Sequence, residues 1–452
     1  MRCALKQSPE RKLSSITKNY DVVVIGGGIA GVMAACAAAD AGGAVLLAEG
    51  GSVLGGVVTQ GPLEAMMTQS DMERKVIAGL ADELLEGLAA SGSAKSVEDT
   101  TGYCSRIVLY DPEWMKQALA DMLSRRGAAY LLDTVVYGAE RSGDTLTGIR
   151  LQARNASFSV SGKAFVDCSG SGTLARLSGN DVLLGDDTGC CQPVTMLSRW
   201  GGVDREALRA YVREHREDFK CFLSALDLDA EYLHLWGFTG ALREGWESGA
   251  LSLYREELHM MELLSDGEVV VNYSRVNADP SDPFSMSHAQ LLCSRQVYEL
   301  FAWFRETIPA FRHATVLQSG YVGVRESGRI RARRILERQD ILNARDDGTS
   351  VAMGAFPIDI HRPGSGMRFE RVLKGYCIPA GALMADGTNN LFAGGRCIGS
   401  TFEANGSCRI SLTCAATGQA AGVMAALYAR DPDAWSVEAV RQELRRQNAV
   451  IV

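Results

Sequence analysis

The chain has 452 residues, of which 46% are hydrophobic and 22% charged, so it is long enough for two or three domain-sized units with sizeable cores. Its formal net charge of −8 at pH 7 argues against nucleic acid or an anionic membrane as a partner. This composition is ordinary for a soluble globular protein and excludes the fibrous and low-complexity classes.

The first element is expected between residues 20 and 60. A β-branched strand over 21–25 precedes three glycines, a helix of small residues over 29–41, and a second strand over 44–48 that ends at an acid. The glycines are Gly26, Gly28 and Gly31, and the acid is Glu49. Such glycines permit a tight turn and close approach to a pyrophosphate, which the helix N-terminus attracts, while the acid can bind ribose hydroxyls. This order predicts a dinucleotide site, and a glycine-rich turn without a nucleotide is the alternative.

The following elements alternate between helices and strands. Periodicity predicts helices over 72–90, 112–126 and 287–306, and strands over 130–136, 164–168, 269–273 and 390–393. The long apolar stretch 410–428 is interrupted by polar residues and glycines, so we expect a buried helix and no membrane span. From about residue 204, charged helices alternate with aromatic runs. The opening pattern of a buried strand, glycines and a helix of small residues returns near residue 390.

These changes in residue pattern along the chain predict a polar extension over 1–20 and a nucleotide-binding domain built from residues 20–200 and 371–452. Residues 201–370 are expected to form an inserted domain. The polar first twenty residues lack an apolar core, so we expect no secretory segment and a cytoplasmic protein.

Several segments resemble the FAD-dependent oxidoreductases of the two-dinucleotide-binding-domain flavoprotein type. They are Leu54–Thr59 with its paired glycines, Leu132–Val136, Val166–Gly172, Asn390–Ile398 and Glu403–Arg409. The resemblance implies an α/β fold with a Rossmann-like, glutathione-reductase-like FAD-binding domain and an inserted α+β substrate or cap domain. It also implies that FAD is the cofactor.

The resemblance further implies which positions hold FAD. They are Gly26, Gly28, Ile29, Ala30, Gly31, Glu49, Gly55, Gly56, Thr59, Val136, Ser169, Gly170, Gly395, Arg396, Ser407 and Cys408. Cys168, Ser169 and Ser171 depart from the family's D-A-T-G-D-G pattern. A helix starting near Ser407 should point its N-terminus at the flavin N1–C2 edge, where reduced flavin carries negative charge.

Arg325, His361 and Arg409 are the candidate catalytic residues. Arg325 could hold an anionic or carbonyl substrate, or form an ion pair with Glu326. His361 could transfer a proton or be a structural histidine, and Arg409 could bind substrate or flavin.

The sequence predicts an oxidoreductase that transfers two electrons to or from a small organic molecule. A non-redox flavoprotein, such as an isomerase or biosynthetic enzyme, and an electron-relay subunit of a larger complex are the alternatives. No second strand–GxGxxG–helix unit occurs, so we expect the electrons to come from or go to a separate donor or acceptor. No C-x-x-C motif occurs either, and we expect no metal site. We interpret the twelve cysteines as small residues of the hydrophobic core. The sequence does not determine the oligomeric state, and an oligomer is compatible with it.

Overall fold

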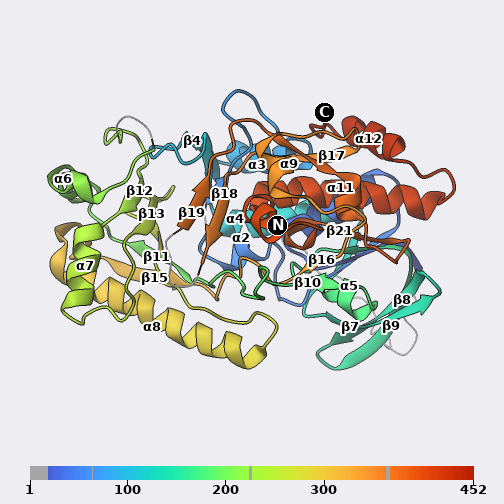
Figure 1. The fold of residues 1–452 in the computed structure, drawn as a ribbon, viewed down its shortest axis with the longest axis horizontal. Coiled ribbons are helices and arrows are strands. Elements are labelled where there is room, and N and C mark those ends of the chain that lie inside the picture. Colours follow the sequence, from blue (N-terminus) through green and yellow to red (C-terminus); the bar gives the residue numbers. More distant parts are fainter. Residues whose placement is uncertain (1–18, 64, 223–225, 363–366) are drawn as a thin grey trace, which may run out of the picture.

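The computed structural model describes residues 19–63, 65–222, 226–362 and 367–452. A largely parallel sheet and an antiparallel sheet, each with its own helices, lie side by side along the longest axis of the molecule (Figure 1). The polar extension predicted over residues 1–20 falls almost entirely outside the described residues.

The parallel sheet is built around the predicted nucleotide element. Its parallel strands are β6 (Ala129–Leu131), β2 (Val45–Ala48), β1 (Asn19–Ile25), β9 (Ala156–Asp167) and β21 (Leu391–Ala393). The antiparallel strands β8 (Thr145–Ala153) and β7 (Val135–Ser142) continue it beyond β9. Val22, Val23 and Val24 are fully buried, as expected for a parallel strand covered on both faces. The predicted α/β class with a parallel sheet is therefore confirmed.

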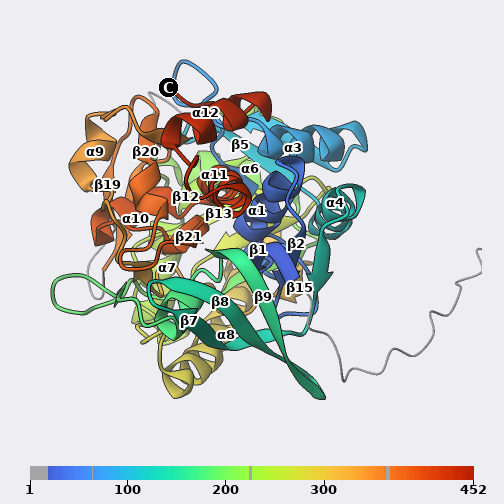
Figure 2. The same cartoon turned by 90° about the vertical axis from the view of Figure 1, so that its right-hand side faces the viewer.

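Two helices from opposite ends of the chain pack together on this sheet (Figure 2). They are α1 (Ile29–Asp40) and α11 (Ser411–Arg430). A Cβ at Gly418 or Gly422 would overlap the carbonyl oxygen of Ala30 or Ala34, so the two backbones are in direct contact. Among the described residues α11 alone has the length and hydropathy of a membrane span, but 83% of that stretch is buried inside the fold. It is the buried helix that the sequence predicts.

The antiparallel sheet lies beside the first sheet and carries a separate hydrophobic core. Its strands are β12 (His234–Gly237), β13 (Leu258–Glu262), β14 (Val269–Asn272), β11 (Leu197–Gly201) and β15 (Thr315–Ser319). The helices α6 (Arg205–Glu214), α7 (Thr239–Glu247) and α8 (Pro283–Thr307) surround it (Figure 1). Trp200, Phe238, Phe304 and Phe311 are fully buried at its centre.

Several further strands and short helices lie outside these two sheets. They are α2 (Val57–Gln60), β3 (Ala65–Met67), β4 (Ala94–Glu98), β5 (Arg106–Tyr110), α5 (Thr173–Leu177), β10 (Val182–Leu183), β16 (Arg329–Ile330), α9 (Arg338–Leu342), β17 (Ser350–Gly354), β18 (Ile358–His361), β19 (Met367–Glu370), β20 (Tyr376–Pro379) and α10 (Phe402–Cys408).

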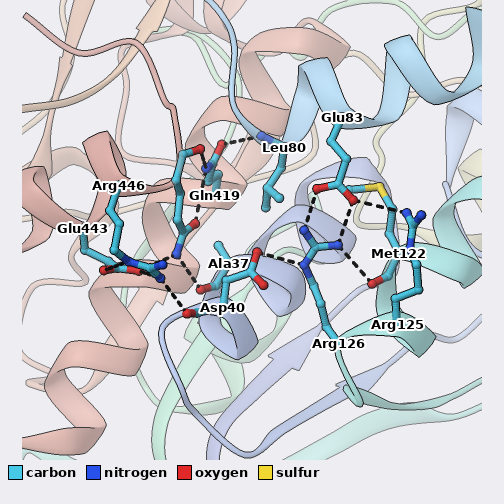
Figure 3. Close-up of polar contacts among 11 residues, drawn as sticks. Ala37, Asp40, Leu80, Glu83, Met122, Arg125, Arg126, Gln419, Glu443 and Arg446 are labelled. Carbon is cyan, nitrogen blue, oxygen red and sulfur yellow. Dashed lines mark hydrogen bonds and ion pairs between the residues drawn. The ribbon is translucent and has the colours of Figure 1, made fainter.

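A polar network fixes the C-terminal end of α1 against α3 (Leu80–Ala90), α4 (Pro112–Arg125) and α12 (Val437–Arg446) (Figure 3). The guanidinium of Arg126 donates to Asp40 at 2.8 Å and to Glu83 at 3.0 Å. Arg446 donates to the carbonyl of Asp40 at 2.7 Å, and Leu80 N donates to Gln419 on α11 at 3.2 Å. Every member contacts protein groups, so we assign this network to holding the helices together.

Several predicted boundaries are corrected by the structure. The helix expected over 72–90 begins only at Leu80, because Gly79 has a φ of +71° that ends the preceding loop. The strand expected over 130–136 is split into β6 and β7 around Asp133, whose φ of +49° breaks the extended backbone. The long helix expected over 287–306 begins earlier, at Pro283, where Asp282 caps it.

Candidate active site

The turn between β1 and α1 forms an open cradle for an anion. Gly26 has a φ of +94°, and a Cβ there would overlap the carbonyl oxygen of Cys168. A Cβ at Gly31 would overlap the carbonyl oxygen of Gly26, whereas a Cβ at Gly28 would meet no atom within 4 Å. The helix begins at Ile29, next to Ala30, and no side chain of the described residues caps it. Free N–H groups facing open space fit a diphosphate.

Glu49 lies beside this turn, at the end of β2. Its carboxylate accepts from Gly27 N at 2.5 Å and from Gly51 N at 2.6 Å. Thr134 N donates to the Glu49 carbonyl at 2.9 Å, which brings the start of β7, with Val136, to the same edge. The positions expected to contact ribose and adenine are thus neighbours.

Gly55 and Gly56 continue the cradle from the other side. Gly55 N donates to the Gly27 carbonyl at 2.7 Å, and a Cβ at Gly56 would lie 3.2 Å from the Gly28 Cα. Thr59 is different, because it is buried and its hydroxyl donates to the Leu54 carbonyl at 2.5 Å. We therefore assign Thr59 to stabilising the conformation of the loop that contains Gly55 and Gly56.

The C-terminal segment returns to the same cradle. A Cβ at Gly395 would lie 2.9 Å from the Ala30 Cβ, at the start of α1. Arg396 Nε donates to the Gly170 carbonyl at 3.2 Å, and its Nη1 donates to the Val324 carbonyl. Ser169 donates to Asp167 at the end of β9 and lies next to Gly26 through the Cys168 backbone.

The helix expected to start near Ser407 starts instead at Ser411. Ser407 and Cys408 are the last two residues of α10, and both are fully buried. The Ser407 hydroxyl donates to the Phe356 carbonyl and pairs with the Tyr376 hydroxyl. The uncapped helix N-terminus at this point is that of α11, and Ile410 and Ser411 line a cavity there. The backbone turn at Arg409–Ile410 separates the two helices, which periodicity cannot locate in so apolar a sequence.

Two adjoining cavities lie between the two sheets. The nucleotide-side cavity is about 280 Å³ and is lined by Val57, Arg396 and Ser411 beside the glycine segments, together with Val324 and Tyr321. The inner cavity is about 190 Å³. Its lining combines the aromatic rings of Tyr103, Trp236 and Phe356 with charged side chains.

The charged side chains of the inner cavity are mostly arginines. Arg255, Arg325 and Arg409 line it together with Asp359, and Arg275 contacts the same group through His361. Burial and the neighbouring Arg275 lower the pKa of Arg255 to about 9, and burial also lowers the pKa of Arg325. Arg409 Nε and Arg275 Nη2 are buried without a hydrogen-bond partner among the described residues. Buried guanidinium groups with N–H donors left over favour an anion at this site.

The structure brings the predicted residues Arg325, His361 and Arg409 together at this cavity. The alternative expectation, an ion pair between Arg325 and Glu326, is wrong, because Glu326 pairs with Arg329 instead. Arg325 donates to the Pro193 carbonyl at 2.5 Å and to Thr195 Oγ1 at 2.8 Å.

His361 is held by polar partners on both ring nitrogens. Arg275 donates to its Nδ1 at 2.9 Å, and its Nε2 lies 3.1 Å from the Asp359 carboxylate. Burial lowers the pKa of His361 well below its ordinary value, and although burial alone would raise the pKa of Asp359, His361 and Arg409 hold it low. The ring is therefore a neutral spacer between an arginine and a carboxylate.

Sequence reasoning missed Arg255, Asn272 and His259 in this cavity. They lie on or beside β13 and β14, and His259 and Asn272 face each other across the strand pair. Polar residues that alternate along a short strand do not by themselves indicate a functional site. These residues approach Arg325 and Asp359 only because of how the two sheets dock.

Comparisons with known proteins agree with this geometry. A family model described as FAD dependent oxidoreductase matches residues 21–445. The sequence matches no curated protein. Among solved structures, p-nitrophenol 4-monooxygenase from Pseudomonas putida is similar with a TM-score of 0.50 and 11% identity, covering 94% of this chain and 84% of that one.

Two other solved structures are similar at lower scores. A geranylgeranyl bacteriochlorophyll reductase-like protein from Thermoplasma acidophilum has a TM-score of 0.46 and 13% identity, with 96% of this chain and 84% of that chain covered. The myxobacterial chondrochloren halogenase has a TM-score of 0.47 and 13% identity, with 95% and 79% covered.

Proposed function

Because this chain belongs to the FAD-dependent oxidoreductase family and is an FAD-carrying enzyme, we propose that its substrate is a small organic anion bound in the inner cavity. The observation that carries the proposal is the excess of arginine over carboxylate. Arg255, Arg325 and Arg409 line a cavity of about 190 Å³, and among the described residues Asp359 is the one carboxylate in its wall. A carboxylate group would supply the missing charge and accept the free guanidinium N–H groups.

The cofactor residues follow from the same arrangement. The open space at Gly28 and the uncapped start of α1 fit the diphosphate, and Glu49 fits the ribose with Val136 beside it. The nucleotide-side cavity, with Val57, Arg396 and Ser411, fits the flavin ring. Bound there, FAD supplies two-electron redox chemistry, for which the protein provides orientation and electrostatics.

The residues of the inner cavity then perform three tasks. Arg255, Arg325 and Arg409 orient the anionic group, and Tyr103, Trp236 and Phe356 exclude water from its organic part. Asp359 fixes the guanidinium of Arg409 at 3.4 Å and the ring of His361. The two-electron exchange is expected where the inner and nucleotide-side cavities meet, since Arg325, Arg409 and Asn272 line both.

The finer architecture belongs to the same proposal. Residues 20–200 and 371–452 would form a glutathione-reductase-like FAD domain, which the parallel pairing of β21 with β9 supports. Residues 201–370 would form the cap, since β13 and β14 supply Asn272 and the side chain of His259 to the cavity. We also propose a cytoplasmic protein that exchanges electrons with a separate donor or acceptor.

The proposal is tested by titrating the yellow holoenzyme with benzoate, 4-methylbenzamide and benzyl alcohol while recording the visible flavin spectrum. Benzoate should perturb the spectrum and saturate, whereas the two neutral probes should not. The holoenzyme should then be mixed anaerobically with a panel of small carboxylic acids. One chemical class of these acids should reduce the flavin and bleach its colour. Binding of the neutral probes in preference to benzoate would contradict the anion site.

A further inference from the structure

Three side chains form a continuous chain of contacts that ends at the inner cavity. Asp99 directly follows β4, His234 is on β12 and His259 is on β13. Trp236 faces His259 in the strand register, and alternate residues of a strand share a face, so His234 and His259 lie on the same face. Their ring centroids are 4.4 Å apart.

Asp99 is held as a carboxylate. It is completely buried, lies 2.5 Å from His234 Nδ1, and accepts further hydrogen bonds from Thr101 N at 2.9 Å and Cys104 N at 2.8 Å. Burial alone would raise the pKa of Asp99, but His234 and these N–H groups hold it well below its usual range. Asp99 therefore accepts a hydrogen bond from the Nδ1–H of His234 and donates none.

The hydrogen-bond network fits one tautomer of each ring when both rings are neutral. With its proton on Nδ1, neutral His234 has a bare Nε2, which accepts from the Nε2–H of His259. His259 then has a bare Nδ1, for which the described residues offer no partner, and its ring lines the inner cavity. The free lone pair thus belongs to a ring that lines the proposed substrate space.

We propose that His259 accepts and returns the proton in the proposed reaction, and that Asp99 and His234 position it. This inference rests on the proposed function, because it needs a ligand in the inner cavity. When a ligand X–H loses its proton, the Nδ1–H bond of His259 forms and the X–H bond breaks. The Nε2–H of His259 then passes to Nε2 of His234, so the proton resides on a His234 imidazolium beside the Asp99 carboxylate.

The surroundings favour His259 over His361 for this role. Both ring nitrogens of His361 are occupied, by Arg275 and Asp359, whereas His259 has a free one. The charged groups around His259 are Arg255, Asp359 and the Asp99–His234 pair, while Arg325, Arg409 and His361 line the same cavity further along. Burial keeps the pKa of His259 well below its ordinary value, so the ring is neutral before a ligand binds.

The first test needs no ligand. Holoenzyme labelled with ¹⁵N-histidine should show by NMR a proton on Nδ1 of His234 and a bare Nδ1 on His259, assigned with His234→Gln and His259→Gln. Asp99→Asn should alter the His234 signals, and His313→Gln, an exposed histidine elsewhere, should leave both rings unchanged. A proton on Nδ1 of His259, or His234 signals that Asp99→Asn leaves unchanged, would overturn the relay.

The second test measures proton uptake on binding of benzoate, by calorimetry of the holoenzyme in two buffers of different ionisation enthalpy. The wild type and His313→Gln should take up close to one proton per benzoate. His259→Gln should bind benzoate with uptake reduced to near zero, and FAD content should be equal in all variants. Undiminished uptake in His259→Gln would overturn the inference. If benzoate does not bind at all, the anion site fails, and the NMR tautomers still decide the relay.

Discussion

Single residues acquired their roles here only through their partners in space. The sequence singled out His361 from six histidines, and the structure places it at the cavity with both ring nitrogens engaged. It gave no reason to choose His259, because that choice depends on Asp99 and His234, which are distant along the chain. Arg325 could be predicted from its family-like segment, but its partners Pro193 and Thr195 could not.

Arg325→Gln should weaken benzoate binding by about tenfold to a hundredfold, since a hydrogen bond to a charged group contributes about 1.5–3 kcal/mol. FAD should still bind, because the open space at Gly28 and the carboxylate of Glu49, which fit its diphosphate and ribose, do not involve Arg325. The measurement is a spectral titration of the flavin, with the exposed Arg312→Gln as the matched control. Equal affinities in both variants would remove Arg325 from the anion site.

The affinity for benzoate should also depend on pH through Arg255. Its pKa in the ligand-free protein is lowered to about 9, so the guanidinium is charged below that pH and loses its proton above it. A bound anion stabilises the charged form, so in His259→Gln, which should bind benzoate without proton uptake, affinity should be constant below pH 9 and fall by up to about tenfold per pH unit above it. Adding Arg255→Lys should shift the inflection, and a flat profile through pH 9 in His259→Gln would refute this assignment.

At the scale of elements, strands and helices with strong patterns were predicted correctly, and boundaries failed where backbone geometry decides them. The helix α4 starts at Pro112 under the cap of Asp111, as the Asp-Pro pair predicts. The division between α10 and α11 was not predicted, because no proline marks a helix end between Phe402 and Arg430. That division matters for the site, since it sets which helix N-terminus faces the cavity.

The contact of α1 with α11 gives a test at this scale. Alanine is favoured over glycine in a helix by about 1 kcal/mol, so Gly87→Ala, on the open face of α3, should stabilise the protein. Gly418→Ala should instead destabilise it, because the new Cβ would overlap the Ala30 carbonyl oxygen and push α11 away from the start of α1. Thermal unfolding of both variants should give shifts of opposite sign, together with loss of FAD in Gly418→Ala. A stabilised Gly418→Ala would show that the helices have room to part.

For the whole molecule, the sequence predicted the class of fold and the nucleotide cradle, because both rest on local order along the chain. The inner cavity was not predictable in the same way. Its wall combines Tyr103, His259, Arg325, Asp359 and Arg409, which come from segments between the two sheets and meet only when the sheets dock. The cradle likewise joins the two ends of the chain, with Gly395 packed against Ala30.

Because FAD would contact both ends of the chain, its binding should stabilise the whole molecule. A ligand that binds only the folded state adds about 4 kcal/mol at a free concentration a thousand times its Kd. The thermal midpoint of the apoprotein should therefore rise steadily with the logarithm of added FAD. In Arg396→Ala the rise should begin at higher FAD concentrations, since Arg396 connects the C-terminal segment to Gly170 and Val324 beside the nucleotide-side cavity. The exposed Arg312→Ala, a residue outside the proposed cofactor site, should follow the wild-type curve. A midpoint independent of FAD, or an unchanged curve in Arg396→Ala, would contradict the placement of the cofactor between the two ends of the chain.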